Sequence, residues 1–177
     1  MLADKPEHLM PHIATKALDP KYGFKMSVPD HQFNFGELYN LSINRGTLTA
    51  EERFKVNEHI VQTIVMLENL PFPKNLRRVP EYAGTHHETL QGTGYPRQLG
   101  PHQLSIPARI MAIADIFEAL TACDRPYKQA KPLSESLRIL ARLRDRGHID
   151  ADLFALFLSS GVHLAYGERH LLTEQLD

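Results

Sequence analysis

The sequence contains one cysteine, no tryptophan and no apolar run that approaches the length needed to span a membrane. Because Cys123 has no second cysteine to pair with, an internal disulfide is excluded, which favours a reducing compartment. The first ten residues lack the basic start and apolar stretch of a secretory signal. These features predict a cytoplasmic protein without a membrane span.

The chain also has little net charge, because Lys and Arg number 20 and Asp and Glu number 21. This balance excludes a protein that holds a nucleic-acid polymer through bulk positive charge. With 42% hydrophobic and 23% charged residues, the composition is that of a globular protein, and 177 residues suffice for a substantial core. Ten histidines are the unusual count and need an explanation.

The first part of the chain gives weak signals for regular structure. Prolines at intervals of roughly ten residues predict loops with one or two short helices in residues 1–45. A capping box at Thr49 and Glu52 then predicts a helix that runs to about Leu70. A second helix is expected over 79–88, with Pro80 in its first turn.

Helix signals dominate the second half of the chain. Residues 89–105 predict a long loop, and loops of this length are more often functional than not. The next helix should run from Ser105 to about Ala122, and it should be buried because it is apolar nearly all round. Further helices are expected over 132–144 and 151–160. No segment is typical of a strand series, so the predicted class is all-α.

Asp115 is the sharpest single feature, because it lies in the middle of the apolar helix. A buried carboxylate is costly unless a metal, a cation or several donors compensate it. The sequence leaves two interpretations open. Asp115 either binds a metal ion or pairs with a cation such as Arg109.

Histidines offer further candidate ligands, since imidazole is the commonest metal ligand near neutral pH. His86 and His87 would diverge by about 100° on a helix, so both can reach one ion only at a helix end or in a crevice. They could equally be two partly exposed polar residues. His59 could instead be bonded at the edge of the core. His8 and His12 are set aside, because Pro11 interrupts the helical spacing between them.

Two loop segments could contact a phosphorylated ligand. Arg125 and Lys128 could form a phosphate clamp, or they could simply complement the dipole of the preceding helix. The turn over 92–96 could present Tyr95 for stacking on a base, or it could be an ordinary surface turn.

The order of these weak signals resembles the second half of an HD-GYP domain. The motifs occur along the chain as His86-His87-Glu88, Gly92-Thr93-Gly94-Tyr95-Pro96, Ala108-Arg109-Ile110, Ile113-Ala114-Asp115, Ala119-Leu120-Thr121 and Arg125-Pro126-Tyr127-Lys128. Residues 46–52 and His59 also resemble the stretch that precedes HHE in this family. The resemblance covers roughly residues 38–158. It implies an all-α, HD-domain-like helical bundle, expected to be incomplete at its N-terminal side.

The resemblance implies a function as well: metal-dependent hydrolysis of cyclic di-GMP by a bacterial signalling phosphodiesterase, through attack of a metal-bound hydroxide. Metal ligands would be His59, His86, His87 and Asp115, and the ions iron or manganese. Asp115 and the histidine pair would form the catalytic centre. The substrate would contact Gly94, Tyr95, Pro96, Arg125 and Lys128. The expected division is an irregular segment 1–37, the domain 38–160 and a tail 161–177.

One departure from the family pattern opens alternatives. The sequence has no His-Asp dipeptide, and the nearest pair is the reversed Asp30-His31 without a following lysine. A homo-oligomer or a partner chain could supply the missing half of the site. Otherwise the chain could be a degenerate module that binds a nucleotide or docks a partner, or a fragment that needs a second chain.

Overall fold

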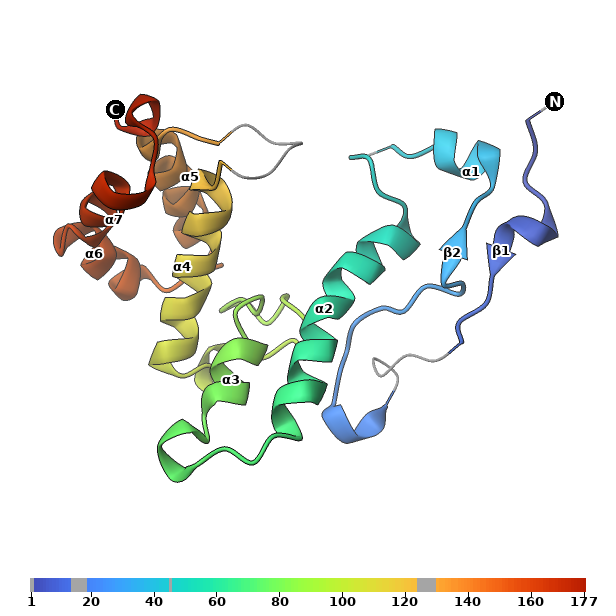
Figure 1. The fold of residues 1–177 in the computed structure, drawn as a ribbon, viewed down its shortest axis with the longest axis horizontal. Coiled ribbons are helices and arrows are strands. Elements are labelled where there is room, and N and C mark those ends of the chain that lie inside the picture. Colours follow the sequence, from blue (N-terminus) through green and yellow to red (C-terminus); the bar gives the residue numbers. More distant parts are fainter. Residues whose placement is uncertain (1, 14–18, 45, 124–129) are drawn as a thin grey trace. The chain divides into compact units, whose positions relative to one another are not determined.

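A computed structural model of the chain describes residues 2–13, 19–44, 46–123 and 130–177. It divides into two compact units, Met1–Pro80 and Glu81–Asp177. In both units the regular structure of the described residues is almost entirely helical, as Figure 1 shows. The all-α prediction is therefore confirmed.

The Met1–Pro80 unit consists of short elements that precede one long helix. In chain order these are η1 (Pro6–His8), β1 (Leu9–Met10), η3 (Pro20–Tyr22), β2 (Phe33–Asn34), α1 (Glu37–Leu41), α2 (Ala50–Glu68) and η4 (Lys74–Leu76). The strands pair antiparallel, with Leu9 opposite Asn34 and Met10 opposite Phe33. This short ladder was not predicted, since two-residue strands leave no alternation to detect.

Helix α2 follows the sequence prediction closely. Thr49 accepts a hydrogen bond from the Glu52 amide, and the Glu52 carboxylate accepts from the Thr49 amide, so the capping box is formed. The helix buries one face, which includes Phe54, Ile60 and Ile64. Burial of that stripe stabilises the helix more than its intrinsic propensity does.

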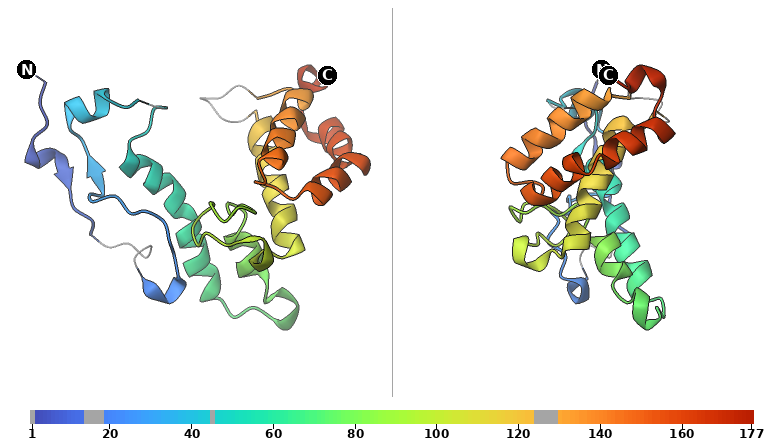
Figure 2. Two further views of the ribbon diagram at one scale, coloured as in Figure 1. Left: turned by 180° about the vertical axis from the view of Figure 1, so that it is seen from behind. Right: turned by 90° about the vertical axis from the view of Figure 1, so that its left-hand side faces the viewer.

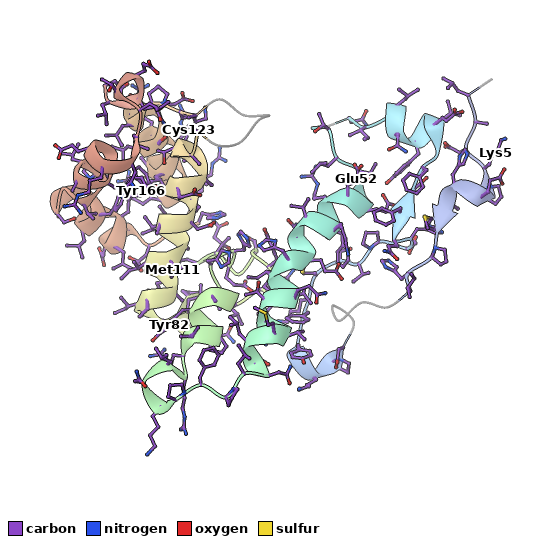
Figure 3. The ribbon with its side chains drawn as sticks, viewed as in Figure 1. Lys5, Glu52, Tyr82, Met111, Cys123 and Tyr166 are labelled. Atoms are coloured by element: carbon purple, nitrogen blue, oxygen red, sulfur yellow. The ribbon has the colours of Figure 1, made fainter. Side chains whose placement is uncertain are left out.

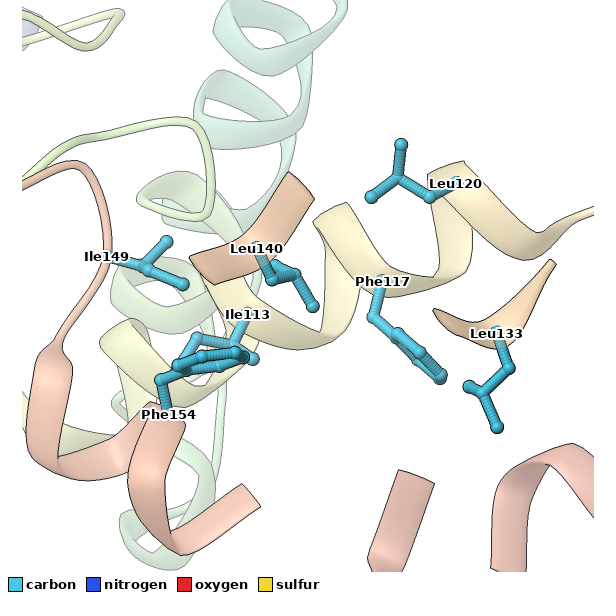
Figure 4. Close-up of a cluster of buried hydrophobic side chains, with 7 residues drawn as sticks. All are labelled: Ile113, Phe117, Leu120, Leu133, Leu140, Ile149 and Phe154. Carbon is cyan, nitrogen blue, oxygen red and sulfur yellow. The ribbon is translucent and has the colours of Figure 1, made fainter. Parts of the chain in front are cut away.

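In the Glu81–Asp177 unit, α5 (Leu133–Asp145) and α6 (Ala151–Ser159) pack on α4 (Ile106–Thr121), and α7 (Val162–His170) packs on α6 (Figure 2). Figure 4 shows the core between them, which consists of Ile113, Phe117, Leu120, Leu133, Leu140, Ile149 and Phe154. The unit ends in η6 (Thr173–Gln175). Helix α7 lies in the stretch predicted as a tail, so a helix was missed there.

The burial of α4 differs from the prediction. Ile113 and Phe117 are buried, but Ile106, Ile110 and Met111 (Figure 3) are exposed. The reason is that α5 and α6 pack against one side of α4 only, and Ile110, outside that contact, lines an open groove of about 510 Å³ that α6 also lines. Apolar composition therefore overstated the burial of this helix.

Candidate metal centre

The histidine pair follows α3 (Val79–Gly84), with Thr85 between the helix and His86. A helix reaching Glu88 was predicted, and this was wrong by four residues. The Thr85 hydroxyl donates to the Glu81 carbonyl at 2.7 Å, and the Glu88 amide closes a tight turn on the Thr85 carbonyl at 2.9 Å. Such side-chain bonds compete with helix continuation. As a consequence, the rings of His86 and His87 lie 4.1 Å apart between centroids instead of diverging.

The ring of His86 is oriented by the end of the helix. Its Nδ1 lies 2.7 Å from the Ala83 carbonyl oxygen, which can only accept. Nδ1 therefore carries the proton and donates, which places the lone pair on Nε2. A backbone carbonyl that binds the second ring nitrogen is the usual support of a metal-ligating histidine.

Asp115 projects from α4 toward His87. Its Oδ2 lies 3.9 Å from His87 Nδ1, which is too long for a hydrogen bond. Two ligands that each lie about 2.0–2.2 Å from one ion can be separated by up to about 4 Å. The distance therefore fits a nitrogen and an oxygen that share a metal ion.

The environment of Asp115 differs from the sequence prediction in two ways. Its side chain is 37% exposed, so the carboxylate is not fully buried. Arg109 is not its partner, because that guanidinium donates to Asp150 Oδ2 at 2.8 Å and to the Leu104 carbonyl at 2.9 Å. The ion-pair interpretation with Arg109 is therefore wrong.

The glycine-rich turn folds back over the histidine pair. A Cβ on Gly94 would lie 2.4 Å from Glu88 Cα and 2.6 Å from the His87 carbonyl oxygen, so only glycine allows this approach. The next amide, of Tyr95, donates to the same carbonyl at 3.2 Å. Pro96, joined to Tyr95 by a cis peptide bond, is fully buried.

The Tyr95 ring stacks on the His87 ring, with centroids 4.8 Å apart and planes at 23°. Burial, and secondly the negative charge of Asp115, raise the pKa of the Tyr95 hydroxyl above its ordinary value. Tyr95 therefore stays protonated at neutral pH and can donate a hydrogen bond. Its predicted role in substrate contact, with Gly94 and Pro96, stays a prediction.

The sequence assigns Glu88 no role beyond its place in the His86-His87-Glu88 motif, and the structure provides one. Its side chain is buried, at 2% exposure. Oε1 accepts from the Arg97 amide at 2.7 Å, and Oε2 accepts from the Leu99 amide at 2.9 Å. The available signal was an acidic residue just before a loop whose amides need acceptors.

The remaining predicted site residues belong to other parts of the chain. His59 lies on α2 in the Met1–Pro80 unit, and its Nδ1 is 2.6 Å from the Val56 carbonyl oxygen. This is the same arrangement as that of His86, with a carbonyl three residues earlier. Asp30-His31 lies in the loop before β2. Arg125 and Lys128 lie outside the described residues.

Among the helices that the structure describes, none is long and apolar enough to cross a membrane.

Comparisons with known proteins identify the family of the chain. The model of the HD domain family matches residues 1–153. A 3'3'-cGAMP-specific phosphodiesterase of Vibrio cholerae is 37% identical over 109 residues, which cover 62% of this chain and 24% of that protein. A cyclic di-GMP phosphodiesterase of Pseudomonas aeruginosa is 34% identical over 136 residues, which cover 77% of this chain and 30% of that protein. A cyclic di-GMP phosphodiesterase of Thermotoga maritima is 36% identical over 121 residues, which cover 67% of this chain and 29% of that protein.

This chain spans less than a third of the length of each of these relatives. The family match nevertheless covers most of the chain, and together with the names of these phosphodiesterases it supports a phosphohydrolase of the HD-GYP type. Phosphohydrolases with this domain depend on metal ions, in keeping with the histidines after α3. The chain therefore belongs to the HD domain family, in its HD-GYP type.

Proposed function

We propose that this chain is the metal-dependent catalytic domain of a phosphodiesterase that hydrolyses cyclic di-GMP. The observation that carries the proposal is the convergence of His86, His87 and Asp115 where α3 ends and α4 passes. The names of the relatives, which specify cyclic di-GMP or 3'3'-cGAMP, support a cyclic dinucleotide as the substrate class.

The proposed ligands are His59, His86, His87 and Asp115, and the proposed ions are iron or manganese. Imidazole suits iron and carboxylate suits manganese, so a mixed set is compatible with either. His59 is included because its ring is held by a backbone carbonyl in the same way as that of His86. When bound, the ions would supply an activated water and stabilise charge on the phosphodiester.

The protein's own groups would orient the ligands and the substrate. Tyr95 covers one face of the His87 ring and excludes water from that side. Its hydroxyl stays protonated and can donate to a substrate oxygen. Gly94 and Pro96 would shape the wall beside it. Arg125 and Lys128, in segment 124–129, are proposed to contact phosphate through charge-assisted hydrogen bonds.

Turnover by protein purified without oxygen, supplied with ferrous iron or manganese, tests the proposal. Product would be measured from cyclic di-GMP and, in parallel, from 3'3'-cGAMP. We expect Asp115→Ala to lower the rate by at least about 100-fold, because loss of a ligand should exceed the roughly 10–100-fold cost of losing an outer partner. Asp145→Ala is the matched control, since that side chain is 63% exposed at the end of α5.

Equal turnover by Asp115→Ala and wild type would contradict the assigned site. Absence of turnover in wild-type protein that binds manganese would contradict the enzymatic proposal. It would favour the second candidate, a module that binds a cyclic dinucleotide without hydrolysing it. That candidate is motivated by the missing His-Asp dipeptide, and calorimetric titration with cyclic di-GMP would test it directly.

A second copy of the chain or a partner chain is the proposed source of the missing ligands. Light scattering with and without manganese would test self-association, and a monomer with full turnover would contradict it. The cytoplasm is the compartment we propose, since a single cysteine suits reducing conditions.

A further inference from the structure

Glu88 is a buried acid whose carboxylate binds backbone rather than a reacting group. Its two oxygens accept hydrogen bonds from different amides, those of Arg97 and Leu99, on the far side of the glycine-rich turn. Bonds from N–H groups to an ionised carboxylate are about twice as strong as neutral ones. A buried carboxylate therefore holds residues 97–99 against the turn that carries the histidine pair.

The turn that precedes these two hydrogen bonds also packs against the backbone of residues 87–89. Gly94 packs against Glu88 Cα and the neighbouring amide of Thr89. The Thr93 amide donates to the Thr89 hydroxyl at 3.1 Å. Loop 92–99 is thus attached along its length to residues 87–89, and Tyr95 lies at its centre.

Tyr95 is the part of this loop that touches a proposed metal ligand. Its ring stacks on His87, and its amide donates to the His87 carbonyl. His87 Nδ1 faces Asp115 from that position. A shift of the loop would therefore alter the orientation of the His87 ring relative to the carboxylate.

We propose that Glu88 is a positioning residue of the metal centre: its carboxylate anchors loop 92–99 so that Tyr95 fixes the ring of His87. The functional part of this inference rests on the proposed metal site. Its structural part, the coupling of Glu88 to His87 through Tyr95, does not require a bound ion.

Glu88→Gln is the informative change, because it keeps the volume of the side chain. An amide retains one acceptor oxygen but turns an NH₂ group toward the second backbone amide, so one of the two attachments is lost. Glu168→Gln is the matched control, since that side chain is exposed on α7 of the same unit.

The first measurement uses metal-free protein with labelled histidines. Stacking on Tyr95 shifts the ring-proton resonances of His87, and Tyr95→Ala defines the spectrum without that stacking. We expect Glu88→Gln to move the His87 resonances most of the way toward those of Tyr95→Ala, with faster hydrogen exchange at the amides of Arg97 and Leu99. Glu168→Gln should match wild type. Unchanged His87 resonances in folded Glu88→Gln protein would overturn the inference.

The second measurement is the affinity for Mn²⁺ by titration calorimetry. Loss of an outer partner of a metal ligand costs about 10–100-fold in affinity, and we expect that range for Glu88→Gln and for Tyr95→Ala. Tyr95→Phe keeps the stacked ring and should bind Mn²⁺ as wild type does. The double variant, Glu88→Gln with Tyr95→Ala, should bind Mn²⁺ no more weakly than Tyr95→Ala alone, because both changes act through the contact between Tyr95 and His87.

The outcomes separate this inference from the proposed function. If Glu88→Gln fails to fold, Glu88→Asp takes its place, because the shorter carboxylate cannot reach the amides of both Arg97 and Leu99, and wild-type His87 resonances in that variant would overturn the coupling. If the loss of Mn²⁺ affinity in the double variant equals the product of the losses in Glu88→Gln and Tyr95→Ala, the two residues act independently, and the coupling is also overturned. Wild-type protein without turnover would contradict the phosphodiesterase activity, but it would leave the resonances of metal-free protein unaffected.

Discussion

Gly94→Ala adds a single carbon atom, and the structure predicts a large loss of stability from it. The new Cβ would lie 2.4 Å from Glu88 Cα and 2.6 Å from both the His87 carbonyl oxygen and the Thr89 amide nitrogen. Unstrained carbon contacts are about 3.5–4.0 Å, so the overlap is about 1 Å. All three atoms belong to the backbone, and no change of rotamer can relieve the clash.

The loop must therefore move away from the histidine turn by about the extent of that overlap. Such overpacking typically costs about 1–3 kcal/mol. The movement would also stretch the bonds from the amides of Arg97 and Leu99 to Glu88, now 2.7 and 2.9 Å. Bonds to a charged group are worth about 1.5–3 kcal/mol each. Because alanine makes the unfolded chain less flexible than glycine does, the substitution also stabilises the folded state by about 0.4–1 kcal/mol, which offsets part of this loss.

We expect Gly94→Ala to lower the free energy of unfolding by about 3 kcal/mol. For a chain of this size that corresponds to a fall in Tm of about 6–12 °C, at about 2–4 °C per kcal/mol. Urea unfolding followed by circular dichroism would measure it. Gly100→Ala is the matched control, since its nearest atom would lie 3.8 Å away and its φ of −82° suits any residue. Equal stability of the two variants would refute the reasoning.

Two further predictions concern the Glu81–Asp177 unit. Burial tends to raise the pKa of Asp150, but amides of α6 and the charge of Arg109 outweigh it and hold the pKa below 3.8. The folded state thus favours the ionised form of Asp150. The stability that this carboxylate contributes is therefore present above pH 3.8 and is lost as the pH falls through the pKa of the folded state. Asp150→Asn should flatten the loss of stability on acidification below about pH 4, measured by urea unfolding at several pH values; an unchanged slope would contradict this. Gln175→Ala should cost about 1–3 kcal/mol, because the buried amide donates to the carbonyls of Thr121 and Lys131 and one or both would lose a partner. Thermal unfolding would measure that cost, and a Tm equal to that of exposed Glu174→Ala would count against it.

Much of the helical structure could be predicted because its signals are local. Helices α2, α4, α5 and α6 all occur where capping residues and apolar spacing placed them. The Asp150 side chain accepts from the amides of Asp152 and Leu153, as an N-cap should. Helix α7 was missed, because it begins directly after Gly161 and contains Gly167, which reads as a break.

The end of α3 illustrates what local signals could not determine. Nothing in residues 79–88 forbids a helix up to Glu88, so one was predicted. The chain turns instead at Thr85, and Glu88 binds amides nine and eleven residues further along. Helix propensity amounts to tenths of a kcal/mol per residue, so a buried, charge-assisted contact overrides it.

The sequence by itself determined the all-α class, most helix positions and the set of polar residues from which a metal site could be built. Only the tertiary structure decided which of these groups meet. Arg109 binds Asp150, 41 residues away, and not Asp115, which faces His87. Glu88 became the anchor of the loop that carries Tyr95. Pairings of this kind depend on how distant segments pack, and residue type and spacing along the chain carry no record of that packing.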